Sequence, residues 1–115
     1  MPEPIDIARD IAELASDALA TNITVLDIGK LSVIADVFVV CSTDNSRQLR
    51  AVQEDVTEGL QEQGVRPLRV EGTADTGWVL LDYGDVVVHL FTEDQRQFYR
   101  LEDVWSEAPK LLVIQ

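Results

Sequence analysis

The sequence has very few of the residues that build metal sites and disulfides. Its 115 residues include one cysteine, Cys41, and one histidine, His89. A single cysteine excludes an intramolecular disulfide and fits a reducing compartment, and a zinc site needs several Cys or His ligands at close spacing. We therefore expect no metal and no cofactor, and we interpret Cys41, which lies in an apolar run, as a small buried side chain.

The motifs of common catalytic and nucleotide-binding sites are also missing. The chain has no Gly-x-Gly-x-x-Gly, Gly-x-x-x-x-Gly-Lys, Gly-x-Ser-x-Gly or Asp-x-Asp motif. We expect the protein not to be an enzyme. The alternative is a nucleotidyltransferase-like enzyme or nucleotide-binding domain that uses Asp82, Asp85 and His89, which lie close together in one hairpin. In the other interpretation, His89 is structural and the two aspartates cap a turn.

Positive charge is scarce. Nine Lys and Arg residues stand against 21 Asp and Glu residues, which gives a formal net charge of −12. Such a surface repels nucleic-acid phosphates, so we expect little direct nucleic-acid binding. It attracts basic proteins and speeds their association, and ribosomal proteins are an abundant basic class. The net negative charge therefore favours a basic partner but does not identify it.

Long hydrophobic runs are absent as well. No apolar stretch approaches the roughly 20 residues that a membrane-spanning helix needs, and the N-terminus lacks the basic and apolar regions of a signal peptide. Hydrophobic residues make up 46% of the chain and charged residues 26%, which are ordinary proportions for a globular domain. We expect a single domain over residues 1–115, soluble and cytoplasmic, without a membrane partner.

Two segments have the spacing of amphipathic helices. After Pro4, apolar residues recur every three or four positions as far as Ala18, which predicts a first helix. Asn45, followed three positions later by Gln48, resembles a capping box, and a C-terminal glycine at Gly64 would close a long second helix. This helix has a narrow apolar seam, which fits core packing better than a groove for a partner helix. The seam consists of Leu49, Val52, Val56 and Leu60.

Several runs rich in β-branched residues predict strands and a hairpin. Asp36 to Cys41 is nearly all apolar, as in a central strand covered on both faces, and Gly84 suits the tight turn of a hairpin. With short helices after residue 92, the order favours an α/β (α+β) domain with a mixed sheet of about five strands flanked by helices. The apolar tail 111–114 fits either an edge strand or a dimer contact. The other predicted strands are 23–28, 68–71, 78–82 and 85–91.

The aromatic residues are concentrated near the C-terminus. Six of the seven follow residue 77, and each is either a core side chain or an anchor for a partner, because aromatic residues with a polar tip are enriched at interfaces. The six are Trp78, Tyr83, Phe91, Phe98, Tyr99 and Trp105.

Several of these segments closely resemble the iojap, or RsfS, family of ribosomal silencing factors. The resemblance covers about residues 5 to 107 and extends upstream through 26–27, 35–40 and 46–48. Its most specific parts are Glu71-Gly72, residues 77–89 (Gly-Trp-Val-Leu-Leu-Asp-Tyr-Gly-Asp-Val-Val-Val-His) and residues 96–105 (Arg-Gln-Phe-Tyr-Arg-Leu-Glu-Asp-Val-Trp).

The resemblance implies a fold, a function and a partner. The implied fold is nucleotidyltransferase-like without the catalytic carboxylates. Members of the family bind a large-subunit ribosomal protein, number fourteen of that subunit, and so block the joining of the large and small subunits and repress translation. A homodimer is also compatible with the resemblance.

The resemblance further implies five partner-binding residues. Trp78, Asp82 and Tyr83 lie in the hairpin that is typical of the family, and Arg96 and Tyr99 lie in its Arg-x-Phe-Tyr segment. Trp78 and Tyr83 would supply buried contact area, while Asp82 would meet basic side chains of the partner. Strand alternation places Trp78 and Asp82 on one face, so Tyr83 joins them only if the turn bends its side chain around.

Overall fold

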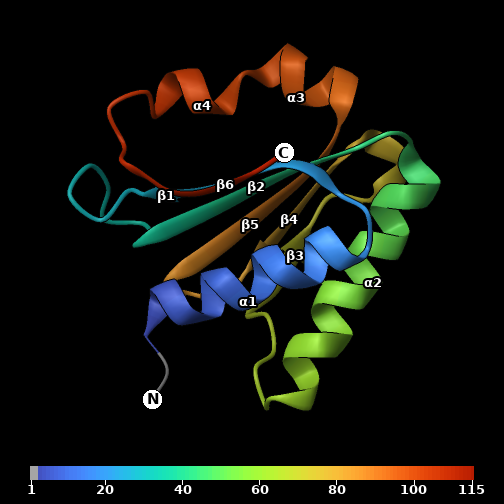
Figure 1. The fold of residues 1–115 in the computed structure, drawn as a ribbon, viewed down its shortest axis with the longest axis horizontal. Coiled ribbons are helices and arrows are strands. Elements are labelled where there is room, and N and C mark those ends of the chain that lie inside the picture. Colours follow the sequence, from blue (N-terminus) through green and yellow to red (C-terminus); the bar gives the residue numbers. More distant parts are fainter. Residues whose placement is uncertain (1–2) are drawn as a thin grey trace.

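The computed structural model describes residues 3–115, which form three layers (Figure 1). Helices α1 (Pro4–Asp17) and α2 (Ser46–Glu62) cover one face of a central sheet. Two short helices, α3 (Glu93–Tyr99) and α4 (Leu101–Val104), cover part of the other face. None of the helices in residues 3–115 is long and apolar enough to cross a membrane.

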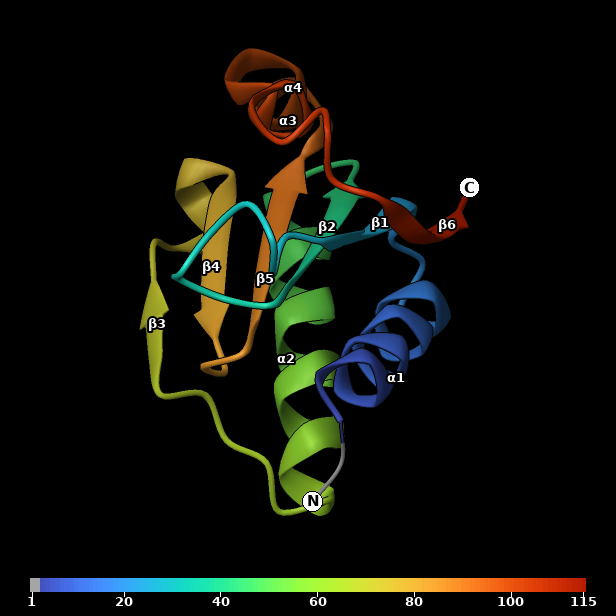
Figure 2. The ribbon, with the colours of Figure 1, turned by 90° about the vertical axis from the view of Figure 1, so that its left-hand side faces the viewer.

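The sheet is mixed and has six strands in the order β3-β4-β5-β2-β1-β6 (Figure 2). The central strands β2 and β5 are parallel, and all other neighbours are antiparallel. The prediction of about five strands falls one short because the C-terminal tail pairs with β1 and becomes an edge strand. The strands are β1 (Thr21–Asp27), β2 (Val37–Thr43), β3 (Arg69–Glu71), β4 (Trp78–Asp82), β5 (Val86–Thr92) and β6 (Lys110–Ile114), and a short 3-10 helix, η1 (Ala74–Thr76), precedes β4.

The local signals in the sequence begin and end α2 as predicted. The Asn45 side chain accepts a hydrogen bond from the Gln48 amide at 2.9 Å, and the Gln48 side chain in turn accepts one from the Asp44 amide at 2.6 Å. Gly64, at φ 80°, follows the end of the helix in the left-handed region. All four residues of the apolar seam are fully buried, which confirms that the seam is part of the core.

The face under α1 and α2 is a closed apolar core. Every described residue of β2 and β5 is buried, and the core includes Ile11 of α1, Leu60 of α2 and Leu81 of β4, all at 0% exposure. Gly59 lets the two helices approach closely, because a Cβ there would lie 2.7 Å from a methyl carbon of Leu14. Cys41 belongs to this core at 0% exposure, which confirms that it is a small buried side chain, and burial raises the pKa of its thiol to about 12.

The opposite face is covered only in part. Helices α3 and α4 lie above the region of β5 and β2, and strands β4 and β3 extend to one side of them (Figure 2). A second apolar cluster lies beneath these helices, with Phe38, Val40 and Phe91 at its centre. Trp78, Leu80, Leu101 and Trp105 border this cluster as half-buried residues. The aromatic C-terminal third of the chain therefore lies mainly on this face.

Candidate functional site

A shallow hollow opens on the partly covered face, where β3 meets β4. It has a volume of about 230 Å³ and is lined by Glu71, Gly72, Trp78 and Leu80. Strand alternation produces it, because Trp78 and Leu80 face this side while Val79 faces the α1–α2 core. Gly72 has φ 80°, and a Cβ there would lie 2.3 Å from the backbone oxygen of Trp78. Only glycine therefore permits this close approach of the two strands.

An aromatic surface extends from this hollow onto α3. The Trp78 ring stacks on Phe91 with centroids 5.1 Å apart and meets Tyr99 at 4.5 Å. The Tyr99 ring in turn meets the edge of Phe98 at 5.0 Å. Tyr99 is 46% exposed and Phe98 is 74% exposed. We call Trp78, Leu80, Phe98 and Tyr99 the aromatic surface. Exposed apolar groups of this size commonly mark sites of protein–protein contact.

His89 lies beneath this surface and is uncharged. The Trp78 indole donates a hydrogen bond to Nδ1 of His89 at 3.3 Å, and the ring of Phe38 lies 4.6 Å away. Burial lowers the pKa of His89 to about 4. Because Nδ1 accepts a hydrogen bond, the proton of the neutral ring is assigned to Nε2, which is buried and has no hydrogen-bond partner within residues 3–115. His89 thus supports the Trp78 ring from below.

The aspartates of the β4–β5 hairpin do not form an acid–base site with His89. One carboxylate oxygen of Asp82 accepts the Gly84 amide at 2.8 Å, and the other pairs with Arg69 at 3.1 Å. Asp85 is exposed on the turn, whereas His89 is bonded to Trp78. Across residues 3–115, no three His, Cys, Asp or Glu side chains are placed to hold a metal ion. Asp82 therefore acts as a turn cap, in agreement with the structural interpretation of the sequence.

Tyr83 lies on the other side of the sheet from Trp78. Its ring packs against the core under α1 and α2, and its buried hydroxyl has no hydrogen-bond partner in the described chain. Burial raises the pKa of this hydroxyl to about 12. The structure thus brings Trp78, Asp82 and Tyr99 to one side of the sheet and leaves Tyr83 apart from them. A contact between Tyr83 and a partner stays a prediction.

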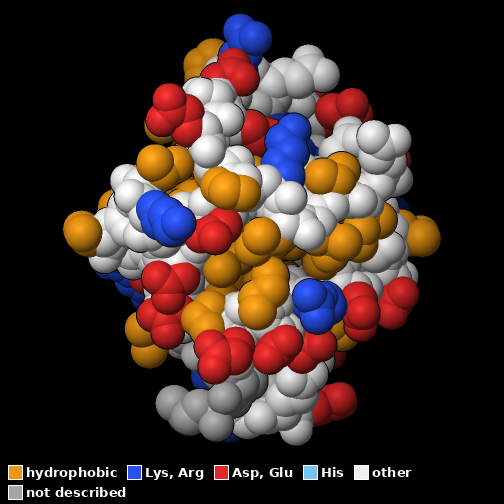
Figure 3. All heavy atoms as spheres, turned by 60° about the vertical axis from the view of Figure 1, so that its left-hand side comes forward, with side chains coloured by type: hydrophobic (Ala, Val, Ile, Leu, Met, Phe, Trp, Pro, Cys, Tyr) orange, Lys and Arg blue, Asp and Glu red, His pale blue; other side chains and the backbone are white. Residues whose placement is uncertain are grey.

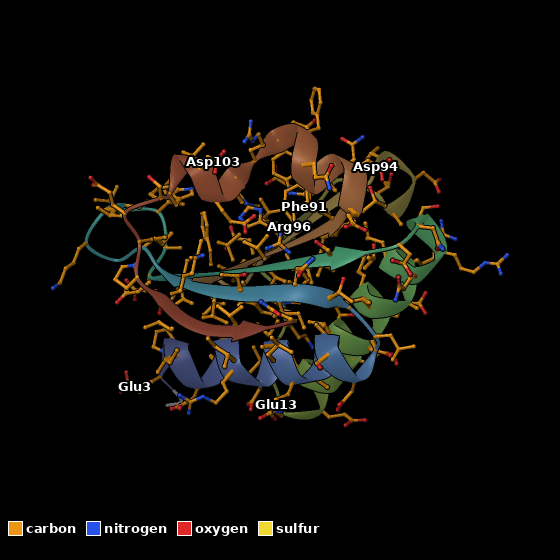
Figure 4. The ribbon with its side chains drawn as sticks, turned by 45° about the horizontal axis from the view of Figure 1, so that its top comes forward. Glu3, Glu13, Phe91, Asp94, Arg96 and Asp103 are labelled. Atoms are coloured by element: carbon orange, nitrogen blue, oxygen red, sulfur yellow. The ribbon has the colours of Figure 1, made fainter. Side chains whose placement is uncertain are left out.

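Arg96 points inward rather than toward solvent. Its side chain is 10% exposed and lies between α3 and the sheet, whereas Asp94 points away from it (Figure 4). Its Nε and Nη2 groups donate to the two carboxylate oxygens of Glu102, at 2.9 and 2.8 Å. Its remaining donors bond to β1 and β2. Arg96 lowers the pKa of Glu102 through these hydrogen bonds.

Several exposed apolar residues of the site have no clear signal in the sequence. Phe98 is one of six late aromatic residues, and Leu80 is one apolar residue within a strand. A second exposed group lies on the β1–β2 loop, where Leu31, Val33 and Ile34 are 44%, 105% and 72% exposed. Figure 3 brings the side of this loop forward and shows hydrophobic side chains gathered among acidic ones. An apolar run in a loop could have indicated this second group.

Comparisons with known proteins agree with one another. The family model described as "Ribosomal silencing factor during starvation" matches residues 1–114. A ribosomal silencing factor of Bacillus subtilis is 36% identical over 103 residues, which are 90% of this chain and 87% of that protein. The chloroplastic protein Iojap of Zea mays is 32% identical over 106 residues, which are 92% of this chain and 46% of that protein.

Solved structures show the same fold. A crystal structure of a protein from Chromobacterium violaceum superposes with a TM-score of 0.87 at 33% identity and covers 91% of this chain and 88% of that one. A protein from Bacillus halodurans superposes with a TM-score of 0.82 at 31% identity and covers 94% of this chain and 98% of that one. The mixed α+β fold expected from the sequence is therefore confirmed.

Proposed function

The chain belongs to the family of ribosomal silencing factors during starvation, which repress translation, and we propose that it binds the large ribosomal subunit and blocks joining of the small subunit. The proposed contact on the large subunit is the basic ribosomal protein number fourteen. The proposed site of action is the cytoplasm, where ribosomal subunits meet.

The observation that carries this proposal is the aromatic surface beside the acidic groups of β3 and β4. Trp78 and Tyr99 are large rings with polar tips and lie 4.5 Å apart, and such residues supply much of the binding energy at protein interfaces. Glu71 lines the hollow and the chain carries a net charge of −12, whereas Asp82, on the same side of β4, is paired with Arg69 within the chain. This combination suits a partner with exposed Lys and Arg side chains around an apolar spot.

The proposed mechanism is steric and needs no reaction. The Cα atoms of the domain extend over 33 × 33 × 24 Å, so a bound copy fills a volume that the small subunit would otherwise approach. The extent of repression then depends only on the fraction of large subunits that carry a bound copy of the protein. Binding affinity, rather than turnover, is the quantity that variants of the aromatic surface should change.

A homodimer is compatible with this proposal. β6 lies at one edge of the sheet, and Leu111 and Val113 on this strand are 44% and 48% exposed. Its outer side pairs with no other strand of residues 3–115. Light scattering at several protein concentrations distinguishes a monomer from a dimer of this kind.

Sucrose-gradient sedimentation of purified subunits, at fixed magnesium and salt, tests the proposal. We expect the protein to travel with the large subunit and to remove the joined-ribosome peak. Trp78→Ala should weaken binding about 30-fold, as the loss of a central aromatic contact does. Phe98→Ser should weaken it less, and Leu19→Ser is the matched control, because Leu19 is equally exposed, at 73%, on the turn after α1.

Two results would contradict the proposal. One is normal subunit joining while the protein stays at the top of the gradient. The other is a folded Trp78→Ala variant that binds the large subunit as the wild type does, which would remove the aromatic surface from the interface. Saturable, magnesium-dependent nucleotide binding in a calorimetric titration would instead favour the enzymatic alternative.

A further inference from the structure

We propose that Arg96 is a positioning residue, which holds the segment 93–104 on the sheet so that Tyr99 lies against Trp78. The inference rests on the proposed function, because it assigns to Arg96 the shape of the surface that would bind the ribosome. It also changes the role expected for Arg96, from a group that touches the partner to one that acts through Tyr99.

The first support is the set of bonds around the guanidinium group. Arg96 donates to both carboxylate oxygens of Glu102 in α4, to Oγ of Ser42 in β2 at 2.8 Å, and to the Asn22 carbonyl and Oγ1 of Thr24 in β1. One side chain of α3 is thereby joined to α4 and to two strands of the sheet. The planar, five-donor group of arginine can make such a set of bonds, whereas the single ammonium group of lysine cannot.

The second support is that the segment has few other attachments. Neither α3 nor α4 contains a fully buried residue, and helices this short do not hold their shape in water without tertiary contacts. Between them, Arg100 has φ 50°, a left-handed conformation that is unfavourable for a residue with a side chain. The apolar attachments of the segment include the half-buried Leu101 and the contact of Tyr99 with Trp78 at 4.5 Å, and the half-buried Trp105 follows the segment directly. Arg96 is therefore the principal polar anchor of the segment.

The third support comes from β1, whose backbone departs from a regular strand opposite Arg96. Asn22 has φ 47°, and the pairing of β1 with β2 shifts register between Thr21 and Thr24. A bulge of this kind frees a carbonyl group from the ladder. The Asn22 carbonyl accepts a hydrogen bond from Arg96. The irregularity in β1 thus provides an acceptor for the inward-pointing side chain of Arg96.

The surroundings argue against Arg96 as a binding group for an anion or a partner. All five N–H groups of its guanidinium are used by the bonds described above. The hollow above it, of about 350 Å³, is also lined by Glu93, Glu102 and Asp103, and its second arginine, Arg100, is paired with Asp103 at 3.0 Å. A phosphate or carboxylate entering there would meet these negative charges and would have to displace Glu102.

Arg96→Gln and Glu102→Gln, studied separately and together, test the inference. Arg9→Gln is the control, because Arg9 is an exposed arginine on α1, on the other side of the sheet. The first measurement is hydrogen exchange of residues 93–104 in the free protein. The second is affinity for the large subunit, with far-UV circular dichroism to establish that each variant is folded.

We expect both single variants to exchange faster in residues 93–104, with no change in α1 and α2. We also expect each to bind the large subunit about tenfold more weakly, a loss similar to that of one charge-assisted hydrogen bond. The double variant should be no weaker than Arg96→Gln alone, because both changes break the same anchor. Arg9→Gln should behave as the wild type. If Arg96→Gln does not fold, Glu102→Gln alone carries the test.

If Arg96 instead contacts the partner directly, Glu102→Gln should have the opposite effect on affinity. Removing the carboxylate would free the arginine, so binding would stay the same or become tighter, and this outcome overturns the inference. Unchanged exchange of residues 93–104 in both variants also overturns it. The exchange measurement needs no ribosome, so failure of the proposed function, seen with Trp78→Ala, is distinguishable from failure of this inference.

Discussion

The two faces of the sheet are built in different ways. The face under α1 and α2 is closed by two long helices, and its residues are aliphatic and almost entirely buried. The face under α3 and α4 is covered by two short helices, is rich in aromatic rings, and contains a buried histidine and an inward-pointing arginine whose side chain is 10% exposed. A continuous apolar core gives stability, whereas half-buried rings and polar networks give a surface with a defined shape. We infer that the first face holds the fold and the second recognises the partner.

The largest effect on stability is expected when two neighbouring leucines on opposite faces of the sheet are each replaced by alanine. Leu81 is fully buried in the α1–α2 core, and Leu80 is half-buried beside Trp78. Leu81→Ala should lower the free energy of unfolding by about 2 to 5 kcal/mol through lost burial and a cavity, and Leu80→Ala by about 1 kcal/mol. Chemical denaturation measures both. Equal losses of unfolding free energy in the two variants would contradict the assignment of one face to stability and the other to recognition.

We expect the opposite order of effects for the same two substitutions when affinity for the large subunit is measured. Leu80→Ala should weaken association with the large subunit, because Leu80 lines the hollow at the aromatic surface. Leu81→Ala should leave the affinity of the folded fraction unchanged. A folded Leu80→Ala protein with unaltered affinity would remove the hollow from the proposed interface.

The next effect comes from His89, the buried titratable group of the α3–α4 face. Its pKa is about 4 in the folded protein, whereas an ordinary histidine takes its proton near pH 6.5. Above pH 6.5 both states are neutral, so His89 has no pH-dependent effect. As the pH falls to 4, the unfolded chain binds a proton that the folded protein does not, and the free energy of unfolding falls by about 3 kcal/mol.

His89→Gln is the comparison for this prediction, because glutamine keeps an acceptor for Trp78 and does not titrate in this range. The difference in unfolding free energy between pH 7.5 and 4.5 should be about 2 to 3 kcal/mol larger in the wild type than in the variant. On the other face, burial raises the pKa of Cys41 to about 12, so that group contributes nothing in this range. If the unfolding free energies of the two proteins change equally with pH, His89 is not held neutral by burial.

The smallest effect concerns the hydrogen bond between Trp78 and His89. Trp78→Phe keeps a ring on Phe91 and removes the N–H donor, so Nδ1 of His89 loses its partner. Trp105→Phe is the matched control, because its indole N–H forms no hydrogen bond within residues 3–115. We expect Trp78→Phe to be less stable than Trp105→Phe by about 1 kcal/mol. Equal stability of the two variants would show that the bond does not support the aromatic surface.

Local patterns were enough to predict most of the elements. Pro4, the Asn45–Gln48 cap and Gly64 each act on neighbouring backbone groups, so their effects can be predicted from adjacent residues alone. The hairpin turn at Gly84 has φ 89°, as expected for a tight turn. The sequence of the tail 111–114 fits either an edge strand or a dimer contact, because its pairing with β1 joins segments far apart in the sequence.

The candidate site was only partly predictable. Strand alternation correctly placed Trp78 and Asp82 on one face, and it indicated that Tyr83 needed a separate explanation. The sequence did not predict that Tyr83 packs on the α1–α2 core or that the Arg96 side chain points inward, against the sheet. Both facts depend on which element covers each face, and no local pattern around residues 83 or 96 contains that information.

Residue type and spacing along the chain are enough to specify the order of the elements, the apolar seam of α2 and the acidic charge. The pairs of aromatic rings in contact, the carboxylate that pairs with Arg96 and the position of the hollow beside Trp78 depend on the folded sheet. Helix and strand periodicity specify which side of an element is apolar, whereas contacts between α3, β4 and β1 form only when the sheet brings distant residues together.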